Sequence, residues 1–175
     1  MLNDFAALPK PIHQQTRGIL QSLLSEKGTH SLPDGTTASA NDVAMHLPVS
    51  SRDFTDFSCS KDHVLNAGEA IQGKRYLPPG FLYFPIGYSG RTSSLVVSGT
   101  PVVRPKGQYK NADGNVEYGP TQGLDYELEM ACVVGKPSEL GKPVDIKDAD
   151  EHIFGLVILN DWSGKLKDSG SVIRE

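Results

Sequence analysis

The sequence predicts an α+β fold that is mainly β. Two runs, 124–134 and 153–159, contain enough apolar and β-branched residues to be strands. Eighteen glycines and twelve prolines in a chain of 175 residues indicate many turns, which a β-rich body needs. A segment with helical spacing of its apolar residues, about 12–26, adds an N-terminal helix to this fold.

The N-terminal helix is predicted from apolar positions that fall on one side of it. These positions are Ile12, Ile19, Leu20, Leu23 and Leu24. Gly28 is expected to end the helix, because glycine readily adopts the left-handed conformation of a C-terminal cap. The stretch 27–42 is polar and contains Pro33-Asp34-Gly35, which is a turn signal.

Two short segments follow that carry ionisable residues. We expect 53–57 to be loop-like and to present the carboxylate of Asp56. The segment from Lys61 to about Ala70 is expected to be a short helix that carries His63. An acid and a candidate base therefore come from one short part of the chain.

The middle and the end of the chain complete the predicted elements. The apolar segments 81–84 and 94–98 are expected to be strands. A turn is predicted at 99–101, and the loop of a β-hairpin at 111–115, with the sequence Asn-Ala-Asp-Gly-Asn. The residues 164–175 are polar, lack an apolar period and are expected to form a tail without regular structure.

Glu127 and Glu129 are the most informative residues for function. Because side chains alternate along a strand, these two acids share one face of the strand predicted at 124–134. Two neighbouring carboxylates repel each other unless a cation or a shared proton lies between them. The pattern therefore predicts half of a divalent-metal site. The residues of the opposite face, which are expected to pack into a core, are Leu128, Met130 and Cys132.

Two further acids complete a candidate cation site. Asp161 follows the apolar run 153–159, so it is expected at the end of a buried strand, where it can enter a site at the sheet edge. The four candidate ligands are Asp56, Glu127, Glu129 and Asp161. Because all four offer oxygen atoms, Ca²⁺ or Mg²⁺ is favoured over zinc, which prefers cysteine and histidine.

Composition argues against several classes of partner. A formal net charge of −4 and the lack of a basic stretch argue against nucleic acid. No apolar segment approaches the roughly 20 residues of a membrane span, and no signal peptide is visible at the N-terminus. Cys59 and Cys132 form no CxxC pair, so a reduced, cytoplasmic setting is expected.

A series of motifs in one order carries a family resemblance. The motifs are Asp53-Phe54-Thr55-Asp56-Phe57, Pro85-Ile86-Gly87-Tyr88, Gly90-Arg91-Thr92-Ser93-Ser94, Val97-Ser98-Gly99-Thr100-Pro101, Asp125-Tyr126-Glu127-Leu128-Glu129-Met130-Ala131, and Glu151-His152-Ile153-Phe154-Gly155 through Asn160-Asp161-Trp162-Ser163. Together they resemble the fumarylacetoacetase family from about Leu2 to Ser163. The resemblance implies a partial mixed-sheet roll of the catalytic domain and a homodimer. It also implies hydrolysis of a carbon–carbon bond in fumarylacetoacetate to fumarate and acetoacetate, the last step of tyrosine catabolism.

The resemblance implies roles for single residues as well. The residues that match the family's Ca²⁺ ligands are Asp56, Glu127, Glu129 and Asp161. Such a metal would hold the diketo oxygens of the substrate and stabilise the enolate that leaves. His63 matches the general base that activates water, a task that suits an imidazole near neutral pH. Tyr88 matches a substrate-contacting tyrosine.

Three positions depart from the family pattern. Ser58 stands where the family has an aromatic substrate contact, and Gln72 stands where it has a substrate-binding arginine nine residues after the base. Lys165 stands where an arginine helps to stabilise an oxyanion, and a lysine supplies charge without a bidentate fork. All three are candidate substrate-binding residues.

The resemblance ends at Ser163 and divides the chain into three parts. We expect a helical linker segment at 1–47, a partial catalytic domain at 48–163 and a non-matching tail at 164–175. The family's N-terminal small β-barrel and its later catalytic residues have no counterpart in this sequence, so a fragment of a longer enzyme is expected. Gly164-Lys165-Leu166 is compatible with a splice-donor sequence, and we hypothesise that the tail is translated intron.

Other interpretations stay open. Ser58 and Gln72 leave room for a changed substrate, as in an acylpyruvate hydrolase or a decarboxylase of the same superfamily. A second alternative is an inactive truncated product that binds only a metal or a partner subunit. Taken singly, Glu-x-Glu is typical of a solvent-facing strand edge, Asp56 and Asp161 are typical of turn or helix caps, and His63 is typical of a surface histidine.

Overall fold

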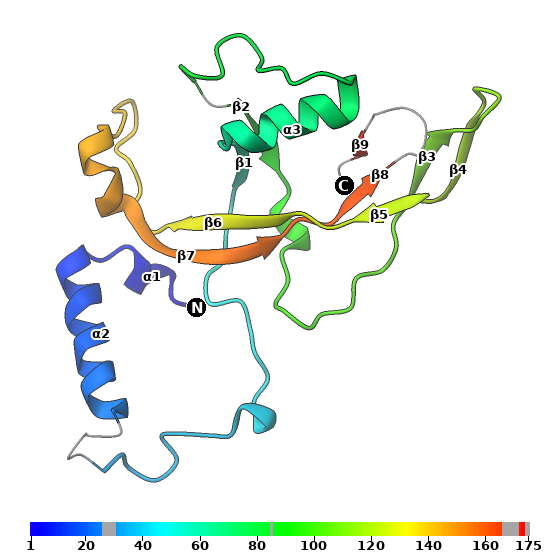
Figure 1. Ribbon diagram of the computed structural model, residues 1–175. Helices are drawn as coiled ribbons and strands as arrows, with labels where there is room; N and C mark the ends of the chain where they lie inside the picture. Colours follow the sequence, from blue (N-terminus) through cyan, green and yellow to red (C-terminus); the bar gives the residue numbers. More distant parts are fainter. Residues whose placement is uncertain (26–30, 85, 166–171, 174–175) are drawn as a thin grey trace. The chain divides into compact units, whose positions relative to one another are not determined.

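Figure 1 shows the computed structural model, which describes residues 1–25, 31–84, 86–165 and 172–173. Helices and small sheets confirm the predicted α+β class. The strand pairs of the described residues are antiparallel, and no parallel pair of the expected mixed sheet occurs among them. Two compact units make up the chain: Met1–Ser50 with Leu128–Asp161, and Ser51–Glu127 with Trp162–Glu175.

The first unit contains an N-terminal helical segment and one pair of strands. Its elements are α1 (Asn3–Ala6), α2 (Lys10–Leu24), the 3₁₀ helices η1 (Ala40–Asp42) and η3 (Ile146–His152), and the strands β6 (Leu128–Val134) and β7 (Ile153–Asn160). Pro11 lies in the first turn of α2, where a missing amide hydrogen costs nothing. Helix α2 confirms the helix predicted at 12–26, whereas its expected cap, Gly28, lies outside the described residues.

Contacts within the first unit join its N-terminal segment to the β6–β7 pair. Phe5, His13 and Phe154 form a cluster of rings, with centroids 4.9 Å apart for Phe5 and His13 and 5.1 Å apart for His13 and Phe154. The carbonyl oxygen of Ala6 lies so close to Gly135 that a Cβ atom there would come within 2.2 Å of it. These contacts hold α1 and α2 against the strand pair.

The second unit contains one α-helix, a 3₁₀ helix and three small sheets in the part of the chain that the structure describes. Its elements are β1 (Phe54–Ser58), α3 (Lys61–Gln72), β2 (Ile86–Gly90), η2 (Thr92–Ser94), β3 (Lys106–Lys110), β4 (Val116–Pro120), β5 (Gly123–Asp125), β8 (Ser163–Lys165) and β9 (Val172–Ile173). Strand β1 pairs with β2, β3 pairs with β4, and β8 lies between β5 and β9.

Helix α3 confirms the helix predicted around His63. The hydroxyl of Ser60 caps its start by accepting a hydrogen bond from the His63 amide at 3.2 Å. Gly73 ends it in the left-handed conformation, with φ of 72°, and donates its amide hydrogen to the carbonyl of Glu69 at 2.9 Å. The two cap residues therefore fix where the helix begins and ends.

The loop between β3 and β4 confirms the hairpin predicted at 111–115. The side-chain oxygen of Asn111 accepts hydrogen bonds from the amides of Asp113 and Asn115 at 3.0 and 2.9 Å. Gly114 has φ of 82°, a conformation that residues with a Cβ atom rarely adopt. The turn chemistry in the sequence thus determines the register of this hairpin.

The prediction of a loop at 53–57 was wrong for 54–57, because these residues lie in strand β1. Phe54, Asp56 and Ser58 are half-buried and alternate with exposed residues. Each residue of β1 pairs with a residue of β2, from Phe54 opposite Gly90 to Ser58 opposite Ile86. Pairing with a distant strand therefore decides the structure of a segment whose own composition is polar.

The strands predicted at 81–84 and 94–98 were wrong as well. The first segment is a turn in which the carbonyl of Gly80 accepts hydrogen bonds from the amides of Tyr83 and Phe84 at 2.8 and 3.0 Å. The second begins in η2 and continues without a strand to the turn at Gly99, which confirms the turn predicted at 99–101. In both places turn chemistry overrides the strand preference of aromatic and β-branched residues.

The polar C-terminal part was expected to be a tail without regular structure. This was wrong for 164–165 and 172–173, because the first two residues belong to β8 and the other two form β9. Strand β8 pairs with β5 on one side and with β9 on the other. The other residues predicted as tail, 166–171 and 174–175, lie outside the described residues.

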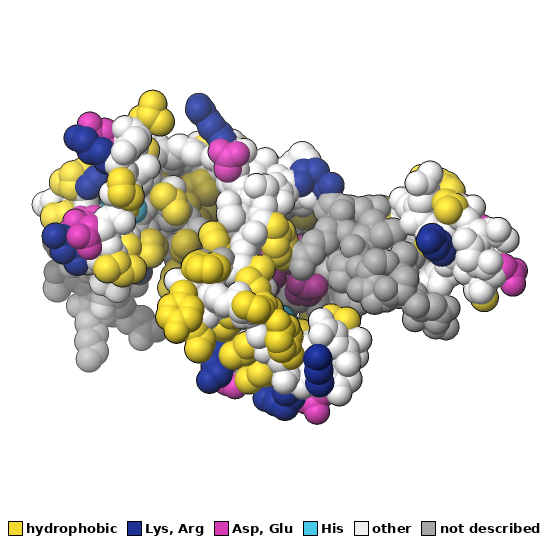
Figure 2. All heavy atoms as spheres, turned by 90° about the horizontal axis from the view of Figure 1, so that it is seen from above, with side chains coloured by type: hydrophobic (Ala, Val, Ile, Leu, Met, Phe, Trp, Pro, Cys, Tyr) yellow, Lys and Arg dark blue, Asp and Glu magenta, His cyan; other side chains and the backbone are white. Residues whose placement is uncertain are grey.

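The core contact predicted for one face of β6 was wrong in this chain. Leu128 and Met130 have exposed fractions of 77% and 69%, and Cys132 is exposed too. Ile158 of β7, which lies opposite Met130, has an exposed fraction of 75%. Figure 2 shows hydrophobic side chains at the molecular surface in yellow. The β6–β7 pair therefore presents an uncovered apolar face.

Burial is sparse among the residues that the structure describes. Ala6 and Ser163 have buried side chains there, with exposed fractions of 3% and 5%. Trp162 is 46% exposed. None of the described helices has the length and apolar character needed to cross a bilayer.

Candidate metal centre

Asp56 lies on the half-buried side of β1, between Phe54 and Ser58. The register of the β1–β2 pair sets Asp56 opposite Tyr88, which is half-buried too. The Tyr88 hydroxyl donates a hydrogen bond to Oδ2 of Asp56. The structure therefore brings together the predicted metal ligand and the predicted substrate contact, and the hydrogen bond orients the carboxylate.

The predicted general base and the other predicted substrate contacts lie on β1, α3 and β8. Ser58 shares the half-buried side of β1 with Asp56. His63 is exposed in the first turn of α3, and Gln72, the last residue of that helix, follows nine residues later. Nine residues are two and a half turns, so the two side chains leave opposite sides of α3. Lys165 ends β8, and its side chain lies outside the part of the chain that is described.

Glu127 lies in a two-residue interruption between strands β5 and β6. Its half-buried carboxylate accepts a hydrogen bond from the hydroxyl of Ser163, with 2.7 Å between Oγ and Oε1. Ser163 begins β8 and lies opposite Asp125 of β5. Sequence reasoning did not single out Ser163, although its position two residues after Asp161 was a signal.

Glu129 and Asp161 lie at one end of the β6–β7 pair. Glu129 is the second residue of β6 and lies opposite Leu159, and Asp161 follows the last residue of β7. Both acids are half-buried, and Glu129 alternates with the exposed Leu128 and Met130. The predicted alternation is confirmed for Glu129 within β6, but the strand expected at 124–134 is interrupted at 126–127, so Glu127 precedes β6 and does not lie on its face.

The donor set suits a hard cation. Asp56 in the second unit and Glu129 and Asp161 in the first unit are each half-buried. Glu127, in the second unit, is half-buried too. Gathering carboxylates that are partly removed from water is unfavourable without positive charge, and oxygen ligands match Ca²⁺ and Mg²⁺. The residues present therefore fit a divalent cation.

Comparison with protein families decides the family of the chain. Residues 53–169 match the family model described as fumarylacetoacetate hydrolase, C-terminal. The chain belongs to the fumarylacetoacetate hydrolase family. Residues 1–48 match the model described as fumarylacetoacetase, N-terminal. The match of the hydrolase domain continues past Ser163, where we expected the resemblance to end, and includes Lys165.

Curated relatives are similar along almost the whole chain. The chain is 44% identical to fumarylacetoacetase of Homo sapiens and 44% identical to that of Caenorhabditis elegans, each over 172 residues. It is 43% identical to fumarylacetoacetase of Oryza sativa subsp. japonica over 171 residues. These alignments cover 94% of the chain but 40% or 41% of each relative. The chain thus spans about two fifths of the length of the hydrolases that it matches.

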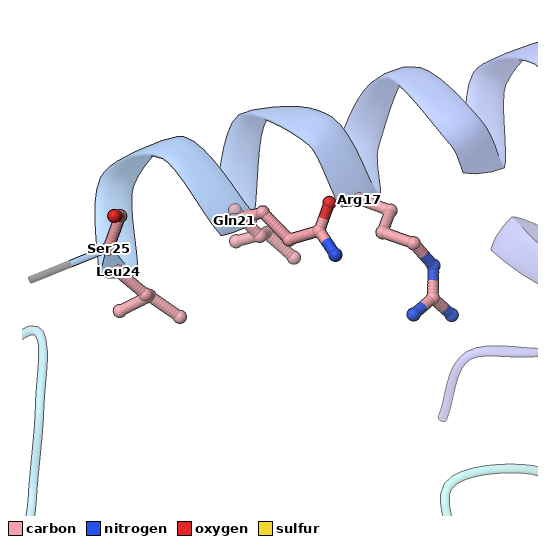
Figure 3. A pocket seen from close by; sticks show the side chains of 5 residues that line it. Arg17, Gln21, Leu24 and Ser25 are labelled. Carbon is pink, nitrogen blue, oxygen red and sulfur yellow. The ribbon is translucent and has the colours of Figure 1, made fainter. Parts of the chain in front are cut away.

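A pocket in the first unit is lined by none of the predicted site residues. Its lining residues are Arg17, Leu20, Gln21, Leu24 and Ser25. Figure 3 shows Arg17, Gln21, Leu24 and Ser25 along α2, the helix that provides this lining. No carboxylate and no predicted site residue lines it, so it contributes nothing to the candidate metal centre.

Proposed function

We propose that the complete protein hydrolyses a carbon–carbon bond in fumarylacetoacetate and releases fumarate and acetoacetate, the last step of tyrosine breakdown. The observation that carries this proposal is the match of residues 53–169 to the fumarylacetoacetate hydrolase family, a segment that contains the half-buried acids Asp56, Glu129 and Asp161. The names of the relatives favour this activity over that of an acylpyruvate hydrolase or a decarboxylase. This chain would supply one part of the active site.

The proposed cation site consists of Asp56, Glu127, Glu129 and Asp161. The cation is proposed to be Ca²⁺ or Mg²⁺. When bound, it would act as a Lewis acid towards the keto oxygens of the substrate and stabilise the negative charge that develops on them. Ca²⁺ accepts six to eight oxygen ligands in flexible geometry, whereas Mg²⁺ requires a near-ideal octahedron, so comparing the two ions tests how rigid the site is.

His63 is the proposed general base. One nitrogen of a neutral imidazole accepts a proton from water while the water oxygen attacks the carbonyl carbon beside the scissile bond. The carbon–carbon bond then breaks, and its electron pair leaves with the acetoacetate part, which takes up a proton on carbon. The exposure of His63 in the first turn of α3 supports this role, because it leaves room for water and substrate.

Tyr88 and Ser58 are proposed to contact the diketo acid substrate. Their position on the same two-stranded sheet as Asp56 supports this assignment. Lys165 is proposed to supply positive charge near the substrate. Gln72 remains a proposed contact as well, but the geometry of α3 requires it to act from the side of the helix away from His63.

The proposed setting of the complete enzyme is a homodimer in the cytoplasm. The dimer is proposed from the family. Cys59 and Cys132 are free and exposed, which supports a reducing compartment, because exposed thiols persist where disulfides do not form. No nucleic acid or membrane is part of the proposal.

The metal centre is tested by titrating Ca²⁺ and Mg²⁺ separately into the purified chain in a calorimeter. Glu129→Gln removes one charged ligand at almost constant shape, and we expect it to weaken binding at least tenfold, on the order of the losses seen around metal sites. Glu139→Gln makes the same change at an exposed residue outside the proposed cation site and is expected to leave binding unchanged. Equal affinities for the two variants would contradict the proposed site.

The substrate is tested with the complete protein. Fumarylacetoacetate and a panel of 3-acylpyruvates are supplied with saturating cation, and the products are separated and quantified. We expect fumarate and acetoacetate from the first substrate and much slower turnover of the panel. Preference for a 3-acylpyruvate would favour the related hydrolases of the superfamily instead.

A further inference from the structure

Ser163 combines burial with a polar side chain. Its exposed fraction is 5%. Among the described residues, Ala6 is the only other one with a buried side chain. A buried hydroxyl is costly unless it forms a hydrogen bond. The hydroxyl of Ser163 donates to Oε1 of Glu127 at 2.7 Å, so its proton points at a carboxylate of the proposed cation site.

Strand pairing holds Ser163 in place. Strand β8 is the middle strand of its sheet, with β5 on one side and β9 on the other. The β5 register sets Asp125 opposite Ser163, and Glu127 follows Asp125 by two residues. Ser163, the donor, therefore lies in a paired strand of the second unit, and Glu127, the acceptor, lies two residues after another.

The hydrogen bond restricts the rotation of the Glu127 side chain. A bond from a hydroxyl to a carboxylate is charge-assisted and short, and 2.7 Å between oxygens fits this class. A carboxylate offers about four acceptor positions, and this bond uses one of them on Oε1 of Glu127. Partners of this kind orient metal ligands, and their loss typically lowers metal affinity 10- to 100-fold.

We propose that Ser163 is a positioning residue that fixes the carboxylate of Glu127 for cation binding. The inference rests on the proposed metal centre. It assigns Ser163 no contact with cation or substrate, and it predicts that the effect of Ser163 on binding passes through Glu127.

The experiment measures binding of Tb³⁺, a hard cation that also takes oxygen ligands, to the 175-residue chain. Trp162 is the single tryptophan and directly follows Asp161, so luminescence excited through it reports binding near that ligand. Ser163→Ala is expected to raise the dissociation constant about 10- to 100-fold. Ser138→Ala, at an exposed serine, is the matched control and is expected to change it less than twofold.

A double-mutant cycle with Glu127→Gln separates positioning from a general structural role. Three carboxylates remain in the Glu127→Gln variant, so weaker binding stays measurable. If Ser163 acts through Glu127, adding Ser163→Ala to this variant changes the dissociation constant less than twofold. A full 10- to 100-fold loss in both backgrounds would mean that Ser163 supports the fold instead, and it would overturn the proposal.

Further results distinguish failure of this inference from failure of the metal centre. Ser163→Thr keeps the hydroxyl and is expected to bind within about fivefold of the unchanged chain, with circular dichroism confirming that each variant retains its secondary structure. Unchanged affinity of Ser163→Ala, with weak binding by Glu127→Gln, would overturn the role of Ser163 and leave the metal centre standing. Absence of binding by the unchanged chain would overturn both.

Discussion

Gly135 shows how one residue without a side chain allows two segments to pack. It follows β6 by one residue, and its amide donates a hydrogen bond to the carbonyl of His152 at 2.9 Å. The carbonyl of Ala6, from α1, occupies the space where a Cβ atom would project. Backbone packed against backbone leaves no flexible group to yield.

We predict that Gly135→Ala destabilises the first unit. The added carbon would lie within 2.2 Å of the Ala6 oxygen, so α1 must shift, and overpacking of this kind costs about 1–3 kcal/mol. Gly155→Ala is the control, because nothing lies within 4 Å of its added carbon, and it is expected to stay within about 0.5 kcal/mol. Urea denaturation followed by circular dichroism compares the two, and equal midpoints would refute the prediction.

The candidate site was only partly predictable residue by residue. Glu127 and Glu129 were found because alternation along a strand is a local property of the sequence. Ser163 was not found, because its partner Glu127 lies 36 residues away and strand pairing alone brings them together. The bond between Tyr88 and Asp56 has the same origin in the β1–β2 register.

At the scale of elements, α3 depends on the residue that precedes it. Ser60 accepts the His63 amide hydrogen, which no carbonyl inside the helix accepts. A capping residue outside the helix therefore determines where the helix that contains the proposed general base begins.

We predict that Ser60→Ala frays the first turn of α3 and costs about 1 kcal/mol. Faster hydrogen exchange of the His63 amide, measured by NMR, is the direct readout. Ser60→Asp is the control, because its carboxylate also accepts from the first turn and is favoured by the helix dipole. Equal exchange in the alanine and aspartate variants would show that the cap has no effect.

Elements with long or strongly periodic sequences were predicted, and short ones were not. Helix α2 and strand β7 follow from apolar spacing over many residues. Strand β1 has five residues, and its polar members Asp56 and Ser58 face the half-buried side, so its pattern resembles a loop. At 81–84 the composition favours a strand, but Gly80, with φ of 83°, starts a turn.

At the scale of the whole molecule, the β6–β7 pair exposes more apolar surface than a stable domain tolerates. Leu128, Met130, Leu156 and Ile158 have exposed fractions between 64% and 77%. Exposed apolar faces and unpaired strand edges promote association between chains. Relatives about two and a half times as long have further residues with which to cover such a face.

We predict that the isolated 175-residue chain associates and shows little or no turnover of fumarylacetoacetate. Replacing the facing pair with Met130→Gln and Ile158→Thr is expected to reduce association, which light scattering coupled to size exclusion measures. Val103→Gln changes a single exposed apolar residue elsewhere and is expected to have little effect. A monodisperse sample of the unchanged chain with cation-dependent turnover would contradict the prediction.

The positions of the two cysteines make the units chemically distinguishable. Cys132 stands on the apolar face of β6, opposite Leu156, and Cys59 directly precedes the cap of α3. Both thiols are exposed, and each belongs to a different unit. A polypeptide that covers the β6–β7 face should slow the alkylation of Cys132, and the alkylation of Cys59 serves as an internal reference. Mass spectrometry of one labelled sample therefore measures docking and local accessibility together.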